Sequence, residues 1–348
     1  MTFKKMTKNK KILIVGAGLT GCILAYRAHK KGYDVTVIDK RSHIGGNIYT
    51  ENINGICVHS YGAHIFHTSD EKVWNFVNKF VHFNNYIHTV KTKLEGKVYS
   101  LPINMNLFNE VFGIIKPSEI KKEHIKKIRD LFFKGYTAKQ WNLTEEELPE
   151  GLFDRIPVRE TYDNRYFNDT YQGIPKEGYT YLVEQLLKGC KVLLNTDYKC
   201  LENPTKEYDK IFYCGMIDEF MDFELGHLEY RSLRFDTQFL NIKNYQGCSV
   251  MNEASIDIPY TRTIEHKFFN FGDDSQDGTI ITKEYPQKYD GTNEAYYTIN
   301  NQKNNALYDR YLKLAKKKFP NIKFCGRLGE YKYYDMDDAI AKAMKIKL

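Results

Sequence analysis

The sequence predicts an α/β fold built around a parallel sheet, and three observations support this prediction. Near the start, residues 11–39 read as a strand, a glycine-rich turn, a helix and a second strand. Two later apolar runs, 211–215 and 322–326, also end in glycine and are typical of buried strands. Strand-like runs between residues 228 and 290 separate these two apolar runs in the sequence. We therefore expect the α/β unit to be assembled from separated pieces of the chain.

The first of these pieces has the order that a dinucleotide-binding unit requires. The apolar run 11–15 precedes a turn with the spacing GxGxxG, and a helical pattern and a second apolar run follow it. Gly16 is expected to make the turn, Gly18 to let a pyrophosphate approach the backbone, and Gly21 to allow close helix packing. The helix N-terminus offers amides to the phosphates. Asp39, 18 residues after Gly21, is placed to bind the ribose hydroxyls of an adenosine.

The chain between these strands predicts elements of other kinds. A second glycine pair ends at Gly46 and is followed by Asn47. Further on, two short runs of alternating polarity within 86–101 are joined by Glu-Gly, as in a β-hairpin. From residue 104 to about 140 the apolar spacing is helical. Residues 152–182, with two prolines and many aromatic residues, are expected to be mostly loop.

The interrupted layout separates two cofactor hypotheses. A simple NAD dehydrogenase completes its sheet without interruption, whereas FAD enzymes of the glutathione reductase type return late in the chain to close the cofactor site. The end of this sequence fits the second kind, because Gly326 and Gly329 follow the last predicted strand and Asp335 opens a final helix. The sequence therefore favours FAD.

Composition and charge exclude several classes of function. With 42% hydrophobic and 27% charged residues, the 348-residue chain has ordinary globular composition, which excludes a disordered or fibrous protein. The net charge of +7 comes from lysines scattered over nearly every segment. A nucleic-acid-binding protein concentrates such residues on one face, so we expect no nucleic-acid partner. The most basic internal run, 121–129, carries isoleucines at near-helical spacing and is expected to be an amphipathic helix.

Cysteine usage and hydropathy indicate the compartment. No stretch approaches the roughly 18 apolar residues of a membrane span. The basic start, residues 1–11, leads into an apolar run that is too short for a signal peptide. Seven cysteines without a CxxC pair are typical of reduced thiols. We therefore expect a cytoplasmic protein with no membrane span.

Several local strings occur in one order over nearly the whole chain. They are Tyr61-Gly-Ala-His64-Ile-Phe-His67-Thr68, Ser100-Leu-Pro-Ile-Asn104, Gly135-Tyr136-Thr-Ala-Lys-Gln-Trp141, Tyr260-Thr-Arg262, Glu294-Ala-Tyr296-Tyr297, and Gly326-Arg-Leu with Tyr331-Lys-Tyr333-Tyr-Asp335-Met-Asp337. Together they resemble the bacterial UDP-galactopyranose mutases. Two departures are Asp39, where the family more often has Glu, and Ala63, which replaces the usual Pro of the Gly-Pro-His string.

The resemblance implies a domain organisation and a reaction. The fold implied is an FAD-binding Rossmann-like domain of the glutathione reductase type with an inserted helical domain and an antiparallel β-sheet domain. We expect the FAD-binding domain at 10–84, 185–226 and 298–348, the helical domain at 104–152, and the antiparallel sheet domain at 85–103, 153–184 and 227–297. The implied reaction interconverts UDP-galactopyranose and UDP-galactofuranose, with N5 of reduced FAD as the nucleophile on the anomeric carbon.

The resemblance also implies roles for individual residues. Arg155 and Arg262 are expected to bind the diphosphate, because guanidinium groups bind phosphate oxygens in pairs. These two arginines, His67 beside the flavin, and Asp335 are the catalytic candidates. The other substrate-binding candidates are Tyr136, Trp141, Tyr166, Tyr297, Tyr333 and, at the sugar end, His59. The cofactor-binding candidates are Gly16, Gly18, Gly21, Asp39, Gly46, Asn47, His64, Gly326, Arg327 and Met336.

Some alternatives stay open. His64 and His67 have the spacing of metal ligands, but no third ligand has convincing spacing, so no metal is expected. A mutase specific for UDP-N-acetylgalactosamine, an FAD-dependent oxidoreductase on an amine or carotenoid-like substrate, and an interaction protein with structural FAD are the rival hypotheses. The resemblance suggests a homodimer and NAD(P)H or another reductant for the flavin. Residues 150–163 are expected to form a lid that carries Arg155 inward.

Overall fold

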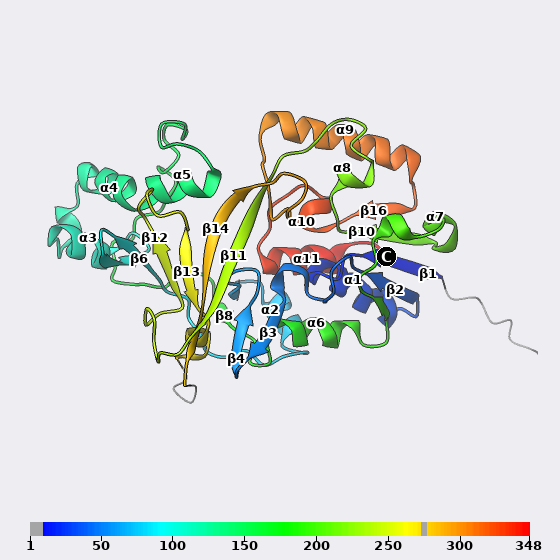
Figure 1. The fold of residues 1–348 in the computed structure, drawn as a ribbon, viewed down its shortest axis with the longest axis horizontal. Coiled ribbons are helices and arrows are strands. Elements are labelled where there is room, and N and C mark those ends of the chain that lie inside the picture. The colour runs from blue at the N-terminus through cyan, green and yellow to red at the C-terminus, as the bar shows by residue number, and fades with distance from the viewer. Residues whose placement is uncertain (1–9, 273–276) are drawn as a thin grey trace, which may run out of the picture.

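Two sheets and a group of helices make up the computed structural model, which describes residues 10–272 and 277–348 (Figure 1). The parallel sheet and its helices lie in one half of the molecule, and the larger sheet and the helices α3–α5 lie in the other. Most of the basic start falls in residues 1–9, outside the described residues. Among the described residues, no helix is long and apolar enough to cross a membrane.

The parallel sheet confirms the strands predicted from the apolar runs. Its five strands pair in the order β16-β10-β1-β2-β9, and every pair is parallel. The strands are β1 (Lys11–Val15), β2 (Asp34–Ile38), β9 (Lys191–Leu193), β10 (Lys210–Tyr213) and β16 (Ile322–Phe324). Alternate residues of β1 enter different cores, Ile12 and Ile14 on one face and Leu13 on the other, because strand side chains alternate between faces.

Helices cover both faces of this sheet. On one face lie α1 (Leu19–Lys30), α2 (Glu71–Val77), α6 (Tyr179–Leu187) and α11 (Met336–Lys345). On the other lie α8 (Ile217–Phe220) and α9 (Gln302–Lys318), with the short α7 (Pro204–Glu207) and α10 (Gly326–Gly329) nearby. The expected domain boundary at residue 185 falls inside α6. Leu182 and Leu186 of this helix are buried in the core that α1 also enters, so the whole helix belongs to the parallel-sheet half.

The second sheet has seven strands in the order β15-β11-β14-β13-β12-β6-β7. They are β6 (Val90–Leu94), β7 (Lys97–Leu101), β11 (Tyr230–Leu240), β12 (Val250–Glu253), β13 (Arg262–Glu265), β14 (Thr279–Lys288) and β15 (Tyr297–Thr298). All pairs are antiparallel except β12 with β6. The predicted hairpin is present, and its turn places Glu95 and Gly96 at positive φ of 49° and 80°.

The predicted helical segment is present but interrupted. It contains α3 (Met105–Phe112), a 3-10 turn (Pro117–Glu119), α4 (Lys122–Arg129), a π-helical turn (Asp130–Lys134) and α5 (Gly135–Trp141). Gly113 ends α3 in the left-handed region at φ 71°, and Pro117 opens the next turn. The amphipathic helix expected over 121–129 is α4, with Ile128 buried.

Two small sheets connect the halves. They are β3 (Thr50–Ile53) with β4 (Ile56–His59), and β5 (Phe66–Thr68) with β8 (Tyr171–Gly173). The remaining 3-10 turns are Gly46–Ile48, Tyr198–Cys200 and His266–Asn270. The predicted α/β fold with a separate, largely antiparallel sheet is confirmed.

Candidate active site

A cavity of about 250 Å³ opens where β1 and β2 end, and the glycine-rich turn forms its floor. Gly16 has φ of 104°, and a Cβ on Gly21 would overlap the carbonyl oxygen of Gly16. A Cβ on Gly46 would lie 2.9 Å from the Cα of Gly18. The spacing GxGxxG and the second glycine pair thus form one backbone cradle that larger residues would fill. Such a cradle suits a pyrophosphate at the N-terminus of α1.

Asp39 lies at the end of β2 and stabilises this cradle. Its Oδ2 accepts a hydrogen bond from the amide of Ala17 at 2.7 Å, and its Oδ1 accepts one from the amide of Arg41 at 2.9 Å. Arg41 in turn donates through Nη2 to Asn47 and to Glu294, each at 3.1 Å. Sequence reasoning missed Arg41 and Glu294 as part of this wall. The only hint in the sequence was that Arg41 lies two residues after Asp39, the acid that ends the second strand.

A second cavity, of about 230 Å³, lies between the two halves and continues from the first. Four residues line both cavities: His64, Arg327, Asp335 and Met336. The second cavity is lined mainly by polar and aromatic side chains, among them Tyr136, Tyr166, Arg262, Tyr297, Tyr333 and His67. The structure therefore brings together most of the predicted catalytic and substrate-binding residues, although they come from segments far apart in the sequence.

Arg262 projects from β13 and is held by a buried carboxylate on the adjacent strand β14. Its Nε and Nη2 both lie 2.9 Å from Oε2 of Glu284, whose side chain is 2% exposed. Burial opposes the charge of the guanidinium, but the Glu284 carboxylate outweighs it and raises the pKa of Arg262. Arg262 is thus a fixed cation in the cavity wall. Glu284 was missed because its partner across the strand pair is set by the register.

Tyrosine hydroxyls add neutral donors to the same wall. Tyr297 and Tyr333 lie with ring centroids 5.9 Å apart, and the Tyr333 hydroxyl donates to Asp335 Oδ1 at 2.9 Å. The guanidinium of Arg327 lies over the Tyr333 ring at 4.8 Å. Burial raises the pKa of Tyr136 and of Tyr297, so both remain protonated donors at neutral pH.

Three histidines line the second cavity, and one of them, His64, also lines the first. Burial lowers the pKa of His64 to about 4, and its Nδ1 donates to the carbonyl oxygen of Gly62 at 2.8 Å. His88, missed by sequence reasoning, lines the second cavity, and burial lowers its pKa to about 3. His67 Nδ1 lies 2.8 Å from Asp169 Oδ2, and its ring stacks on Phe167 with centroids 3.6 Å apart.

Two predicted substrate residues do not line the second cavity. Arg155 is exposed in the loop that follows α5, and its neighbour Asp154 pairs with Arg129 of α4 at 2.9 Å. Trp141 ends α5, and the guanidinium of Arg231 lies 4.9 Å from the centroid of its ring. Tyr136, on the same helix, does line the cavity, so α5 presents only one of its two predicted aromatic residues there.

His59 also lies away from the cavity, behind His64. Its Nδ1 accepts a hydrogen bond from the amide of His64 at 3.2 Å, and its ring stacks on Phe269 with centroids 4.5 Å apart. The side chain is buried, and its Nε2 has no hydrogen-bond partner among the described residues. The structure thus places His59 beneath the loop that presents His64, because β4 points it into the protein interior.

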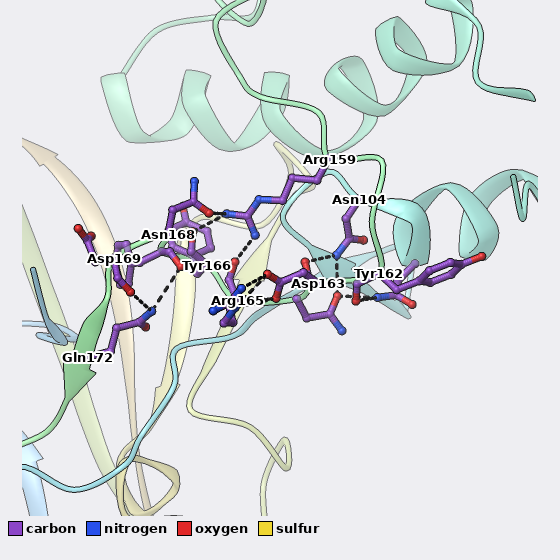
Figure 2. Close-up of polar contacts among 12 residues, drawn as sticks. Asn104, Arg159, Tyr162, Asp163, Arg165, Tyr166, Asn168, Asp169 and Gln172 are labelled. Carbon is purple, nitrogen blue, oxygen red and sulfur yellow. Dashed lines mark hydrogen bonds and ion pairs between the residues drawn. The ribbon is translucent and has the colours of Figure 1, made fainter. Parts of the chain in front are cut away.

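The loop 159–170 contributes Tyr166 and Phe167 to the lining of the second cavity. Polar contacts anchor this loop (Figure 2). The Arg159 guanidinium donates to the carbonyl oxygens of Arg165 and Tyr166 and to the side chain of Asn168. Asn104 donates to the carbonyl oxygen of Asp163 at 2.9 Å. The segment 150–163, expected to be a lid, therefore divides into two parts near Arg159. These contacts fix the second part, residues 159–163.

Comparisons with known proteins agree with this site. A family model described as UDP-galactopyranose mutase matches residues 131–333, and one described as an NAD(P)-binding Rossmann-like domain matches residues 14–80. The first match contains Arg262 and four of the five tyrosines that line the second cavity, and the second contains the glycine cradle. The predicted nucleotide-binding unit and the predicted mutase function are confirmed.

Related proteins cover nearly the whole chain. A protein named Probable UDP-galactopyranose mutase from Klebsiella pneumoniae is 40% identical over 97% of this chain and 94% of its own length. A dTDP-fucopyranose mutase from Escherichia coli is 37% identical over 96% of this chain and 97% of its own length. A crystal structure of reduced UDP-galactopyranose mutase shares the fold with a TM-score of 0.71 at 14% identity, covering 96% of this chain and 94% of that one. With this agreement over its length, the chain belongs to the UDP-galactopyranose mutase family of enzymes.

Proposed function

We propose that this enzyme interconverts UDP-galactopyranose and UDP-galactofuranose, with reduced FAD in the first cavity and the sugar nucleotide in the second. One observation carries the proposal: the two cavities share His64, Arg327, Asp335 and Met336, and beyond these residues the second cavity presents Arg262 and tyrosine hydroxyls. A flavin and a sugar diphosphate would therefore meet at the junction.

The residues of the first cavity fit FAD. The cradle of Gly16, Gly18, Gly21 and Gly46 would hold the pyrophosphate, and Asp39 would bind the ribose. The other predicted cofactor residues, Asn47, His64, Gly326, Arg327 and Met336, line the same cavity. When bound in reduced form, FAD supplies the nucleophile for the anomeric carbon of the sugar.

The residues of the second cavity would bind the diphosphate and stabilise UDP as it leaves. Arg262 is charged, but Glu284 already neutralises it, so the pair carries no net charge for a ligand with a negative charge on each phosphate. Arg327 supplies one further cation in the lining. We propose that Arg155 supplies another when the loop 150–158 closes, while Tyr166 and Tyr297 donate neutral hydrogen bonds. Tyr333 would donate one only when its hydroxyl turns from Asp335 to the diphosphate.

Tyr136 and Trp141 would bind the uracil from α5. Tyr136 already lines the cavity, and Trp141 lies at the end of the same helix, stacked with Arg231. Closure of the loop that follows α5 would enclose the base between these residues and exclude water from the reacting sugar. Asp335 would act at the junction, where it accepts a hydrogen bond from the Tyr333 hydroxyl, and His67 would act from the wall of the second cavity.

Three rival substrates or activities are distinguishable. The Escherichia coli relative acts by its name on a dTDP-fucose, and a UDP-N-acetylgalactosamine mutase would use the same diphosphate contacts. An oxidase of an amine or a carotenoid-like molecule would need an apolar funnel, whereas this cavity presents arginine, histidine and tyrosine side chains. Charged and hydroxyl groups would lose their hydration against an apolar substrate without gaining a partner.

The decisive experiment is incubation of the purified protein with dithionite and each sugar nucleotide, followed by chromatography of the products. We expect UDP-galactofuranose to yield UDP-galactopyranose, and much slower turnover of the dTDP-fucose and UDP-N-acetylgalactosamine forms. Equal rates with oxidised and reduced protein would contradict the role of reduced FAD. Turnover of only the dTDP sugar would instead assign the relative's specificity.

The wider setting follows from the same proposal. NAD(P)H would reduce the flavin, which anaerobic bleaching of its visible absorption tests. All seven cysteines are unpaired, which fits a reducing cytoplasm. We propose a homodimer by resemblance to the family, and sedimentation equilibrium measures that state directly.

A further inference from the structure

A histidine and a carboxylate form a close pair at the edge of the second cavity. His67 belongs to β5, and Asp169 lies in the loop just before β8, the strand that pairs with β5. His67 Nδ1 is 2.8 Å from Asp169 Oδ2, and the two side chains are only 13% and 30% exposed. His67 lines the cavity, while Asp169 lies behind it as seen from the cavity.

Asp169 is itself held from several sides. The hydroxyl of Ser69 donates to its Oδ1 at 2.8 Å, so each carboxylate oxygen has one partner. Its backbone carbonyl oxygen accepts a long hydrogen bond of 3.5 Å from Gln172 Nε2. The same nitrogen donates to the carbonyl oxygen of Phe167 at 3.3 Å (Figure 2). Arg159 Nη2 donates to Oδ1 of Asn168, the residue immediately before Asp169, at 2.7 Å and fixes its position. The carboxylate is therefore a fixed acceptor.

This arrangement determines which nitrogen of His67 carries hydrogen. An ionised carboxylate can only accept hydrogen bonds, so Nδ1 must be the protonated nitrogen of the pair. In the neutral ring, Nε2 then keeps its lone pair. Stacking on Phe167 fixes the plane of the ring at the same time. The ring thus offers a hydrogen-bond acceptor of defined direction.

We propose that Asp169 is a positioning residue, which holds His67 so that Nε2 is an acceptor in the wall of the second, substrate cavity. This inference rests on the proposed function, because it assigns His67 to the reaction in that cavity. His67 is the group that contacts the reactants, and Asp169 acts only through it. The pair resembles in chemistry the carboxylate that orients the histidine of hydrolytic triads.

The test is replacement of Asp169 by Asn in the flavin-loaded enzyme. The amide has the same shape, but with Ser69 donating to its oxygen it presents NH₂ to Nδ1, so the ring must place its hydrogen on Nε2. We expect kcat to fall at least about tenfold, the scale seen when the carboxylate behind an active-site histidine is replaced. KM and the affinity for UDP should change little, because Asp169 does not line the cavity.

A second readout follows the tautomer without turnover. The ¹⁵N resonances of the His67 ring, assigned with a His67→Gln variant, distinguish a protonated Nδ1 from a protonated Nε2. We expect a protonated Nδ1 in the starting enzyme and a protonated Nε2 in Asp169→Asn. Asp169→Glu keeps a carboxylate and should restore part of kcat. Ser69→Ala, which removes only the second partner of Asp169, should cause a smaller loss.

The chain offers a matched control pair. His82 Nδ1 lies 3.0 Å from Glu177 Oε1, but the His82 side chain is 85% exposed and lines neither cavity. Glu177→Gln should leave kcat unchanged. An Asp169→Asn enzyme with wild-type kcat and unchanged ring resonances would overturn the inference. If the starting enzyme does not convert UDP-galactofuranose to UDP-galactopyranose, the proposed function fails instead, and the resonances still decide the tautomer.

Discussion

The two cavities are built in different ways. The first is formed largely by backbone: a Cβ on Gly21 would collide with Gly16, and a Cβ on Gly46 would collide with Gly18. The second is formed by side chains that come from α5, the loop before β8, β13, β15 and the start of α11. One is specified by a short stretch of sequence, and the other depends on the whole fold.

This difference teaches where each cavity is sensitive. A backbone cradle loses its ligand when volume is added, whereas a side-chain wall loses function when a charge or hydroxyl is removed. Arg155, which we propose completes the second cavity on loop closure, does not line it in this structure. The predictions below test these contrasts, starting from the largest expected effect.

Arg262→Ala should produce the largest loss. It removes a fixed cation from the second cavity, and loss of one such electrostatic group commonly costs about 3 kcal/mol in the transition state, a hundredfold or more in rate. Flavin should stay bound, because Arg262 does not line the first cavity. Steady-state kinetics with UDP-galactofuranose and the flavin absorption spectrum measure both outcomes.

Stability must be separated from catalysis in this variant. Arg262→Ala leaves Glu284 buried without its partner, which typically costs about 3–5 kcal/mol. The double variant Arg262→Ala with Glu284→Gln should recover thermal stability but not turnover. If turnover returns together with stability, Arg262 acts only as a structural residue, and the assignment to the diphosphate is wrong.

Gly46→Ala should weaken flavin binding. At φ of 55° an added Cβ is strained, and it would lie 2.9 Å from the Cα of Gly18. Strain of about 1–3 kcal/mol in this region corresponds to roughly tenfold or more in affinity. Gly96→Ala is the matched control, since Gly96 has φ of 80° but no atom within 4 Å and lies in the β6–β7 hairpin. Flavin titration of the apoprotein should separate the two variants.

The same contrast explains what the sequence could predict. The cradle was readable because its spacing is local: Gly16 to Asp39 span one strand-turn-helix-strand unit. The partner of Arg262 was not readable, since Glu284 meets it only through the register of β13 on β14. Trp141 and Arg155 were placed at the substrate by resemblance alone, and their positions relative to the cavity depend on how the loop after α5 folds. The other misses, His88 and the pairing of Arg41 with Glu294, likewise depend on contacts between segments far apart in the sequence.

Four largely buried histidines, His59, His64, His88 and His266, should make stability fall in acid. Desolvation lowers the pKa of His64 to about 4, those of His88 and His266 to about 3, and that of His59 well below 6.5. Above pH 6.5 these rings are neutral in both the folded and the unfolded state, so they do not change the free energy of unfolding. As pH falls from 6.5 towards 4, the unfolded chain binds protons that the folded protein rejects, and each group costs up to about 1.4 kcal/mol per pH unit.

Thermal unfolding from pH 7.5 to 5 checks this prediction. The melting temperature should decline as pH falls below 6.5, and His266→Gln should make the decline shallower. His266 is chosen because it bonds Thr282 at 2.7 Å and lines neither cavity. The exposed His82 offers the control, because folding hardly removes its ring from water. A pH-independent melting temperature would contradict the prediction.

The smallest effect is expected in the mobility of residues 150–158, the segment that we propose brings Arg155 to the second cavity. Three contacts from the Arg129 guanidinium hold this segment to α4: to Asp154 Oδ1 and the Asp154 carbonyl oxygen, each at 2.9 Å, and to the Ile156 carbonyl oxygen at 3.0 Å. Arg129→Ala removes all three, whereas Lys126→Ala, an exposed change on the same helix, removes none of them.

Trypsin reports this mobility because Arg155 and Arg159 are both cleavage sites. Arg155 is exposed, whereas Arg159 is anchored through Asn168 and through its amide to Ile103, so cleavage after Arg155 should be the faster. Arg129→Ala should accelerate cleavage after Arg155 a few-fold, since surface contacts of this kind are worth about 1 kcal/mol. Saturating UDP should slow it in the unaltered enzyme, because closure brings Arg155 to the diphosphate. If UDP leaves the rate after Arg155 unchanged, Arg155 does not complete the second cavity, and its charge must be supplied by another residue.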